Sequence, residues 1–415
     1  MNFKTIQRLK NYQVLNTGNI NMAKVMAARL YSKGFLDFIK TLLLSLLFES
    51  NFIYKDSKSD FIISKNFDSD KRKDYDFIYK KLKDTLIDFN EIIFIKRFKP
   101  FYLLLNIKNT IIYYKKNKST DILFSERVKI SLLENYFNNL LIKLHSFSFN
   151  SKVYISFCDS YLEENLAAQF FNYNGTLTAT LQHGQYRLNN KGYESTDSES
   201  YLNLVSDYIF VWGIKTKHEF LKAGVNPEKI IVTGALKPFT QNNKIINHKT
   251  IKSFIVFLNG ESHVESNYKM ILLANEFAEL YDFTYVIRPH PMNPLKKYLK
   301  KTNYKFNGLV YKEDQTFNND FAIVHSSGIF LELMSKNFPF FHLLDDYLDS
   351  IFRNDYNNFS NITELKCLYE SLVLDHSTFI EEMTKDYKLF NIASNFSELD
   401  LRYKSAIKSI TNKIK

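Results

Sequence analysis

The chain has 415 residues and a mass of 49.0 kDa, and at about 100–200 residues per domain this length predicts two or three domains. Hydrophobic residues make up 45% of the chain and charged residues 24%, which excludes a disordered or collagen-like protein. The net charge is +11, and no zinc-finger or RNP1-like spacing accompanies it. The surplus charge therefore favours an anionic membrane surface or a phosphorylated substrate over nucleic acid.

The first 150 residues show a mixed pattern without recognisable chemistry. Their most apolar stretch, Phe35–Phe48, is interrupted by Asp37 and Lys40 and is too short to span about 30 Å of hydrocarbon. It predicts a buried helix, with an interfacial helix as the alternative. Apolar periodicity predicts helices over Met22–Leu47, Tyr75–Leu86 and Ser125–Leu144, and strands at Phe61–Ser64 and Glu91–Lys96.

After Asn150 short apolar runs alternate with amphipathic segments, which predicts βαβ units and a parallel sheet. One predicted helix, Lys215–Ala223, stops at Gly224, because glycine is favoured just past a helix C-terminus. Another helix is predicted at Tyr161–Phe171. The predicted strands are Lys152–Phe157, Leu177–Leu181, Tyr208–Val211 and Lys229–Thr233.

The polar segment Gln241–Thr250 predicts an interdomain link, and a second α/β series follows it. From Tyr356 to Lys415 the pattern is mostly helical. The predicted strands of this series are Phe254–Leu258, Phe283–Ile287, Leu309–Tyr311, Phe321–Val324 and Pro339–His342. Its predicted helices are Ser266–Leu280, Pro294–Lys300 and Ile329–Lys336.

Two such series predict an α/β fold of two Rossmann-like domains facing a cleft, with C-terminal helices. We expect an N-terminal domain over residues 1–240, a C-terminal domain over 251–390 and a last helix over 391–415. Parallel sheets bind ligands at the carboxyl ends of their strands. Unusual residues directly after predicted strands are therefore the candidate site.

The first such group is Arg288-Pro289-His290-Pro291, directly after the predicted strand Phe283–Ile287. Two prolines fix φ and remove two backbone donors, so they present the imidazole of His290 rigidly. A histidine held there, with the forked guanidinium of Arg288, suits a phosphate oxygen. The alternative is a proline turn with an incidental histidine.

The second group is His325-Ser326-Ser327-Gly328, between the predicted strand Phe321–Val324 and a predicted helix. Two hydroxyls and a glycine at a helix start predict an anion site. Glu332, one turn into the helix, is a candidate for a ribose hydroxyl or for a capping role. Simple capping by Ser326 or Ser327 is the alternative for the pair.

The third group, Gln182-His183-Gly184-Gln185, follows the predicted strand Leu177–Leu181 in the N-terminal half. A histidine before a glycine at a strand end places a titratable group where a backbone passes closely. His183 is therefore a candidate general base for an acceptor hydroxyl. The alternative is a structural histidine.

Weaker signals lie at other strand ends. Asn259-Gly260-Glu261 predicts a phosphate-facing turn with Glu261 as a candidate base, a solvated loop being the alternative. Lys237 is expected to face the cleft, Trp212 to lie in the core and Asp159 to cap a helix. Two Asp-x-Asp triplets, at 68–70 and 74–76, predict a solvated charged loop, so no metal site is expected. The absence of GxxxxGK[ST], GxGxxG, GxSxG and HExxH argues against ATPases, dehydrogenases and zinc hydrolases.

At His183-Gly184, His290-Pro291 and Ser326-Ser327 the chain resembles bacterial GT-B glycosyltransferases of surface polysaccharide synthesis. The similar groups are capsule Kdo transferases, sialyl- and polysialyltransferases and teichoic-acid glycerophosphotransferases; the UDP-N-acetylglucosamine 2-epimerase fold is more distantly similar. The resemblance covers about Val153–Leu344. In sialyltransferases an HP motif and a serine pair contact the cytidine nucleotide, and in glycerophosphotransferases an HG histidine is the proposed base. The sialyltransferase acidic-acidic-Gly motif has no match, and Asn259-Gly260-Glu261 only approximates it.

The resemblance implies a metal-independent glycosyltransferase of class EC 2.4, without a cofactor, that acts in capsule or lipopolysaccharide synthesis. Its donor would be a cytidine-activated sugar, a CMP-linked Kdo- or nonulosonate-type acid, bound by the C-terminal domain. Its acceptor, a glycan or glycolipid, would be held by the N-terminal domain and activated by His183 or Glu261. Gly184, Gln185 and Lys237 would lie on the acceptor or cleft side. The implied donor-nucleotide residues are Gly260, Arg288, His290, Pro291, Ser326, Ser327, Gly328 and Glu332, with His290 also stabilising the departing phosphate.

Three alternatives remain: a CDP-polyol phosphotransferase, a UDP-sugar 2-epimerase-like enzyme and a non-enzymatic membrane-associated assembly protein. The basic segment Met1–Lys10 is not followed by an apolar signal core. Cys158 and Cys367 belong to no CxxC or His-rich cluster, which argues against a disulfide scaffold. We therefore expect a cytoplasmic protein whose surplus charge favours peripheral contact with the anionic inner membrane.

Overall fold

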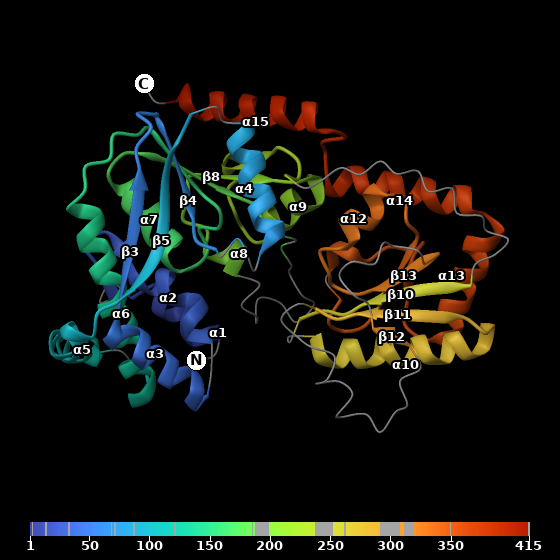
Figure 1. Ribbon diagram of the computed structural model, residues 1–415, viewed down its shortest axis with the longest axis horizontal. Helices are drawn as coiled ribbons and strands as arrows, with labels where there is room; N and C mark the ends of the chain where they lie inside the picture. Colours follow the sequence, from blue (N-terminus) through green and yellow to red (C-terminus); the bar gives the residue numbers. More distant parts are fainter. Residues whose placement is uncertain are drawn as a thin grey trace.

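The computed structural model describes residues 1, 3–12, 15–31, 34–67, 69, 72–85, 88–119, 122–184, 186, 199–236, 252–260, 263–290, 308–310, 319–348 and 350–413. These residues form two large sheets, each covered by helices, which lie side by side along the longest axis (Figure 1). The prediction of two Rossmann-like α/β domains is confirmed.

The first sheet has seven strands in the order β3-β5-β4-β6-β7-β8-β9. Neighbours pair in parallel, except that β3 runs antiparallel to β5 at one edge. The chain adds β5 on one side of β4 and the later strands, from β6 on, on the other side. The strand order therefore reverses between β4 and β6, at the centre of the sheet. The strands are β3 Phe48–Lys55, β4 Phe61–Lys65, β5 Asn90–Phe98, β6 Val153–Ser156, β7 Leu177–Leu181, β8 Tyr208–Val211 and β9 Ile230–Val232.

Helices cover both faces of this sheet because its central strands are apolar on both sides. Tyr154 of β6 packs with α1, α2, α6 and α7, whereas its neighbours Val153 and Ile155 pack with α4 and α15. A short antiparallel pair, β1 (Asn16–Thr17) and β2 (Ile20–Asn21), joins α1 to α2. The helices of this domain are α1 Phe3–Lys10, α2 Met22–Tyr31, α3 Phe35–Leu47, α4 Lys73–Thr85, α5 Leu103–Lys116, α6 Phe124–His145, α7 Leu162–Tyr173, α8 Glu199–Leu202 and α9 Ile214–Lys222.

The second sheet is parallel throughout, in the order β12-β11-β10-β13-β14-β15. In chain order this is 3-2-1-4-5-6, the strand order of dinucleotide-binding folds. Its strands are β10 Ser253–Phe257, β11 Thr284–Arg288, β12 Leu309–Val310, β13 Phe321–Val324, β14 Phe340–Leu343 and β15 Asn358–Phe359. Its helices are α10 Val264–Tyr281, α12 Phe330–Ser335, α13 Ile362–Leu374 and α14 His376–Phe390.

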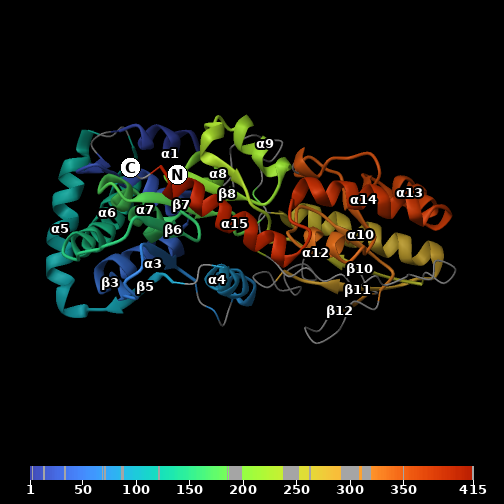
Figure 2. The same ribbon diagram turned by 90° about the horizontal axis from the view of Figure 1, so that it is seen from above.

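The end of the chain returns from the second domain to the first. Helix α15, Phe396–Thr411, lies over the first domain (Figures 1 and 2). Its Leu399 and Tyr403 are buried in the same core as α4. At the crossing, Ile392 N donates to Trp212 O over 3.1 Å. A Cβ on Gly213 would lie 2.5 Å from Phe390 O, so only glycine fits there. Trp212 itself is buried, as predicted.

Most predicted elements are confirmed within a few residues, and the differences have local causes. The predicted helix Met22–Leu47 is two helices, α2 and α3, because Gly34 at φ 102° interrupts it. The elements α1, β1, β2, β3, α5, α8 and β15 were not predicted, and α12 is shorter than expected. The predicted link Gln241–Thr250 and the predicted helix Pro294–Lys300 lie outside the described residues.

The prediction of a buried helix at Phe35–Phe48 is wrong. Helix α3 buries only Thr41 and Ser45, whereas Phe35 is 76% exposed. Among the described helices, none is long and apolar enough to cross a membrane.

Candidate functional site

The second sheet brings two of the three predicted motif groups to one place. Its strand order reverses between β10 and β13, and ligands of doubly wound sheets bind outside the carboxyl ends of the strands at this reversal. Asn259 and Gly260 lie two and three residues after the end of β10, and His325 and Ser326 directly follow β13. Parallel pairing of Val256 with Ile323 brings both loops to the same edge.

His290 joins this edge from the neighbouring strand β11. Three of its ring atoms, Cε1, Nδ1 and Nε2, lie 3.8–4.0 Å from the position of a Cβ on Gly260. Similar distances from three ring atoms mean that the face of the ring lies over the side of Gly260 where a Cβ would stand. Arg288, the last residue of β11, pairs in register with Phe257, and its guanidinium carbon lies 5.6 Å from the Phe257 ring centre. The structure thus places His290, Arg288 and Gly260 together.

His325 is fully buried and links the two central loops. Its Nε2 donates to Asp345 Oδ1 over 2.9 Å, and its Nδ1 accepts from Asn259 Nδ2 over 3.2 Å. Asn259 is held further by Asn267, whose side chain bonds the backbone N and O of Asn259 at 2.8 and 3.0 Å. Within the described residues, the buried Oδ1 of Asn259 accepts no hydrogen bond. An amide acceptor is therefore buried beside the strand-order reversal.

Asp345 holds the other end of this network. It also accepts from Ser266 Oγ over 2.6 Å and from Tyr347 N over 2.8 Å. Burial alone raises the pKa of Asp345, but the hydrogen bonds from His325 and Ser266 outweigh it and hold this pKa well below its usual range. On β14, burial and then the nearby His325 lower the pKa of His342 to about 3. Sequence reasoning missed Asp345, whose loop follows a different strand.

The serine pair lies in a loop before a short helix. Ser326 is buried, Ser327 and Gly328 are partly exposed, and Ser327 N donates to His325 O over 2.7 Å. Helix α12 starts at Phe330 with no side-chain cap, so simple capping by either serine is wrong. Glu332 lies in the first turn and pairs with Lys336 at 2.6 Å.

His183 lies in the first domain, at the end of β7, inside a cluster of aromatic rings. Its Nδ1 lies 3.2 Å from Tyr186 Oη, and its ring centre lies 5.3 Å from Phe157 and 5.4 Å from Tyr75. The guanidinium carbon of Arg72 lies 3.3 Å from the ring centre of Tyr75, so a positive charge lies beside this aromatic cluster. Among the described residues no atom lies within 4 Å of a Cβ on Gly184, and residues 185 and 187–198, which follow it, lie outside the described residues.

Two comparisons by sequence find nothing, since no protein-family model and no curated protein matches the chain. Among solved structures, the chain is similar to a putative UDP-N-acetylglucosamine 2-epimerase from Listeria monocytogenes. That match has a TM-score of 0.52 and 14% identity, and it covers 86% of this chain and 97% of the other. The chain has the GT-B fold. At 14% identity the likeness establishes the architecture and leaves the activity to the residues of the site.

Two further structures are similar at lower scores. One is MnaA of S. aureus in complex with UDP, with a TM-score of 0.48, 13% identity and coverage of 85% and 96%. The other is a glycosyltransferase from Rickettsia africae, with a TM-score of 0.47, 10% identity and coverage of 86% and 99%.

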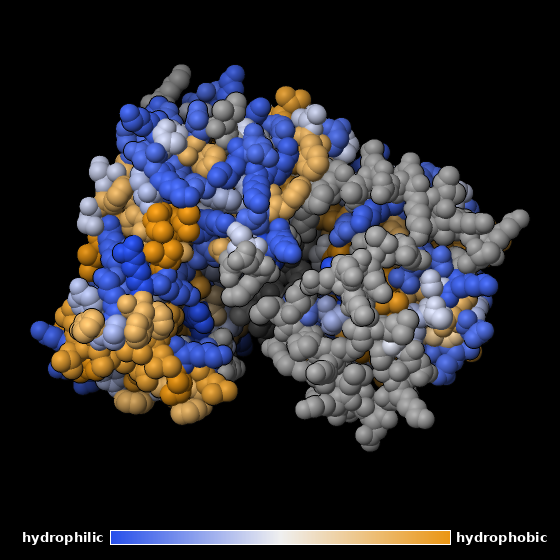
Figure 3. Space-filling model, viewed as in Figure 1, coloured by the Kyte–Doolittle hydropathy of each residue, from blue (hydrophilic) through white to orange (hydrophobic). Residues whose placement is uncertain are grey.

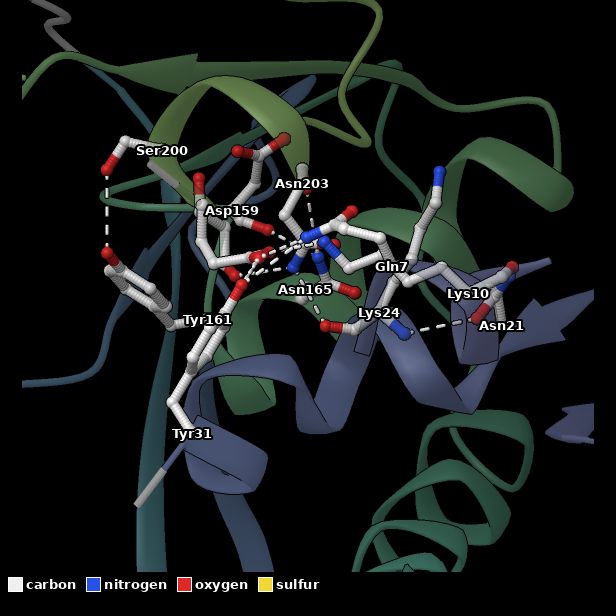
Figure 4. Close-up of polar contacts among 12 residues, drawn as sticks. Gln7, Lys10, Asn21, Lys24, Tyr31, Asp159, Tyr161, Asn165, Ser200 and Asn203 are labelled. Atoms are coloured by element: carbon white, nitrogen blue, oxygen red, sulfur yellow. Dashed lines mark hydrogen bonds and ion pairs between the residues drawn. The ribbon is translucent and has the colours of Figure 1, made fainter. Parts of the chain in front are cut away.

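The GT-B fold of this chain also contains a buried polar cluster that the sequence did not predict. Lys10 of α1 pairs with the buried Glu199, which also accepts from Tyr31 Oη over 2.7 Å. Asn203 donates to Lys24 O and Ser160 O over 2.8 and 2.7 Å, so residues distant in sequence meet here (Figure 4). Because its members come from distant segments, no local spacing signals the cluster.

Two buried carboxylates lie near the carboxyl end of β6: Asp159, in the loop after the strand, and Glu164, in α7. The prediction that Asp159 caps α7 is wrong, because its Oδ2 accepts from Val205 N and Ser206 N over 3.0 and 2.7 Å. Glu164 accepts from the backbone N of Phe157 and Cys158 over 3.0 and 2.9 Å. Burial raises the pKa of Glu164 to about 7 despite these hydrogen bonds.

Four predicted site residues lie outside the described residues. They are Gln185, Lys237, Glu261 and Pro291.

Proposed function

We propose that the protein is a GT-B enzyme that transfers a sugar from a nucleotide-activated donor to a glycan or glycolipid acceptor. One observation carries the proposal. Gly260, His290 and His325 follow three different strands of the second sheet and meet where its strand order reverses. Doubly wound sheets bind nucleotides at this position.

The chemistry of these residues supports a donor site. Arg288 and His290 supply cationic and hydrogen-bonding groups for phosphate oxygens, and the absent Cβ of Gly260 leaves backbone exposed beside them. The buried Oδ1 of Asn259 offers an acceptor for an N–H group of the nucleotide. The finer proposal is a cytidine nucleotide, which rests on the resemblance at His290-Pro291 and Ser326-Ser327.

In the proposed reaction an acceptor hydroxyl attacks the anomeric carbon of the donor sugar. The bond between that carbon and the phosphate oxygen breaks, and the nucleotide leaves with the bonding electrons. The acceptor proton goes to His183, whose Nδ1 already contacts the hydroxyl of Tyr186. His290 and the loop Ser326–Gly328 stabilise the charge that develops on phosphate, and the loss of one such donor costs about 10²–10³ in rate.

The test is thermal unfolding of the purified protein with CMP, CDP, UDP or GDP. A nucleotide at 100 times its dissociation constant should stabilise the protein by about 2.7 kcal/mol. We expect CMP to do so, and His290→Ala to abolish the effect. The matched control is His218→Ala, which removes an exposed histidine of α9 in the other domain.

Each other outcome has a definite meaning. Selective stabilisation by CDP would favour polyol-phosphate transfer over transfer of a CMP-linked sugar. Selective stabilisation by UDP would favour a UDP-sugar transferase or a 2-epimerase. No stabilisation by any nucleotide would contradict the donor site and favour the assembly protein. His183→Ala should keep nucleotide stabilisation and lose transfer, because His183 lies in the first domain.

A further inference from the structure

Helices α3 and α5 bury polar residues and expose apolar ones, the reverse of ordinary surface helices. An amphipathic helix in water buries its apolar stripe and exposes polar residues. Here α3 buries Thr41 and Ser45, and α5 buries only Asn106. Asn106 Nδ2 donates to Leu46 O over 2.9 Å and its Oδ1 accepts from Asn135 Nδ2 of α6 over 3.3 Å. Polar contacts thus join these helices to each other, while eight of their apolar side chains point outward into solvent.

The outward side chains form one surface, which we call the apolar face. It comprises the exposed hydrophobic side chains within residues 35–43, 98–112 and 123–124. Phe101 is 98% exposed, Leu104 81% and Phe35 76%. The apolar face holds thirteen of the 26 large exposed hydrophobic side chains in the described part of the chain. Figure 3 shows hydrophobic side chains gathered over α3 and α5. Apolar patches of this kind mark interaction surfaces.

The central segment of the apolar face is rich in positive charge. Residues 96–118 contain six lysines and one arginine and no acidic residue. Lys99 and Lys116 pair with Glu49 and Glu134 at 2.9 and 2.7 Å. The other five side chains are exposed: Lys96, Arg97, Lys108, Lys115 and Lys118. An exposed apolar surface with a basic rim complements an anionic lipid bilayer.

We propose that the apolar face docks the protein on an anionic lipid surface, with α3 and α5 lying within the headgroup layer. The two helices have 13 and 14 residues. At about 1.5 Å per residue each is about 20 Å long, shorter than the roughly 30 Å hydrocarbon core, so they lie on the bilayer and do not cross it. In lipid, the inverted packing becomes favourable, because polar side chains bond between helices and apolar ones face acyl chains.

The position of the apolar face agrees with docking. Helix α5 lies at the end of the molecule farthest from the second domain in both views (Figures 1 and 2). Docking there leaves the second sheet in water, so the inference stands independently of the proposed function. A second copy of the chain fits less well, because a symmetric dimer would bring the two basic rims together.

The test is flotation of the purified full-length protein with vesicles of phosphatidylcholine alone or with about one third phosphatidylglycerol. We expect the protein to float with the anionic vesicles. The double variant Phe101→Ser with Leu104→Ser should bind at least about tenfold more weakly, since two apolar side chains no longer enter the lipid. The matched control is Leu374→Ser with Leu401→Ser, which changes leucines that are 89% and 69% exposed elsewhere.

Charge is tested separately with Lys108→Gln and Lys115→Gln. Each change should weaken binding to the anionic vesicles about fivefold, the equivalent of one well-placed cation. Phe101→Trp adds a second reporter, because the single natural tryptophan, Trp212, is buried. Its emission should shift to the blue when the anionic vesicles are added.

Two results would overturn the proposal. One is equal flotation of the wild type and the serine double variant, which would show that binding does not use the apolar face. The other is a stable wild-type dimer by light scattering that does not float and that the serine variant converts to monomers. In that case the occupant of the apolar face would be a second copy.

Discussion

At the scale of single residues, the carboxylate of Asp345 fixes the loops of the candidate donor site. It accepts from His325 Nε2, Ser266 Oγ and Tyr347 N. An amide offers one acceptor oxygen, so Asp345→Asn turns its NH₂ toward one of these donors. We expect it to lower the free energy of unfolding at pH 7 by about 1–3 kcal/mol, measured by chemical denaturation. Ser266→Ala, which removes one donor, should cost less; an equal cost would contradict this account.

The same carboxylate gives this stabilisation a pH dependence. Burial opposes ionisation of Asp345, but its hydrogen bonds hold the folded pKa well below the usual 3.8. Because the folded pKa is the lower one, the stabilisation is fully present above the usual pKa. It is lost as the pH falls through the folded pKa. The difference between wild type and Asp345→Asn should therefore narrow below about pH 4 and stay constant between pH 6 and 8.

The site residues show what sequence can and cannot predict. His290 and His325 were found because each lies within two residues of the end of a strand whose apolar run is easy to recognise. Asp345 was missed because only the parallel pairing of β13 with β14 brings its loop beside His325. Asp159 was misread as a cap because the amides it binds lie 46 and 47 residues later in the chain.

At the scale of elements, the junction between α9 and the end of α14 has room only for a glycine. A Cβ on Gly213 would lie 2.5 Å from Phe390 O, and nearby Lys215 pairs with Asp386 at 2.5 Å. Because the obstacle is backbone, Gly213→Ala should destabilise the protein by about 1–3 kcal/mol in thermal or chemical unfolding. Gly184→Ala is the control, because the described structure leaves space for its Cβ. Similar losses in both variants would refute the steric argument.

Elements were predictable to the extent that their own residues determine them. The strands after Asn150 are short apolar runs buried on both faces, so the sequence alone locates them. Helix α3 was also locatable, but which of its faces is buried depends on Asn106 and Asn135 in other helices. Strand β3 was missed because it begins directly after α3, without a turn residue between them.

At the scale of the whole molecule, α15 joins two domains that separate sheets define. The helix belongs to the C-terminal end of the chain, yet Leu399 and Tyr403 are fully buried in the core of the first domain. Gly234, at φ 107°, lies against Ala393 in the segment that leads into α15. A Cβ on Gly234 would lie 2.7 Å from Ala393 Cβ, so glycine is needed for this close approach. The last helix is therefore part of the folding unit of the first sheet.

Because α15 packs in the first domain, removing one of its buried side chains should affect the first sheet more than the second. Leu399→Ala removes a buried side chain from the first domain and should cost about 2–5 kcal/mol in stability. Hydrogen exchange should then quicken in β6 and β7 of the first sheet, with β10 and β13 of the second less affected. Leu401→Ala, on the same helix but at a residue 69% exposed, should change neither stability nor exchange. Faster exchange confined to β10 and β13 would instead assign α15 to the second domain, because exchange rises where packing is lost.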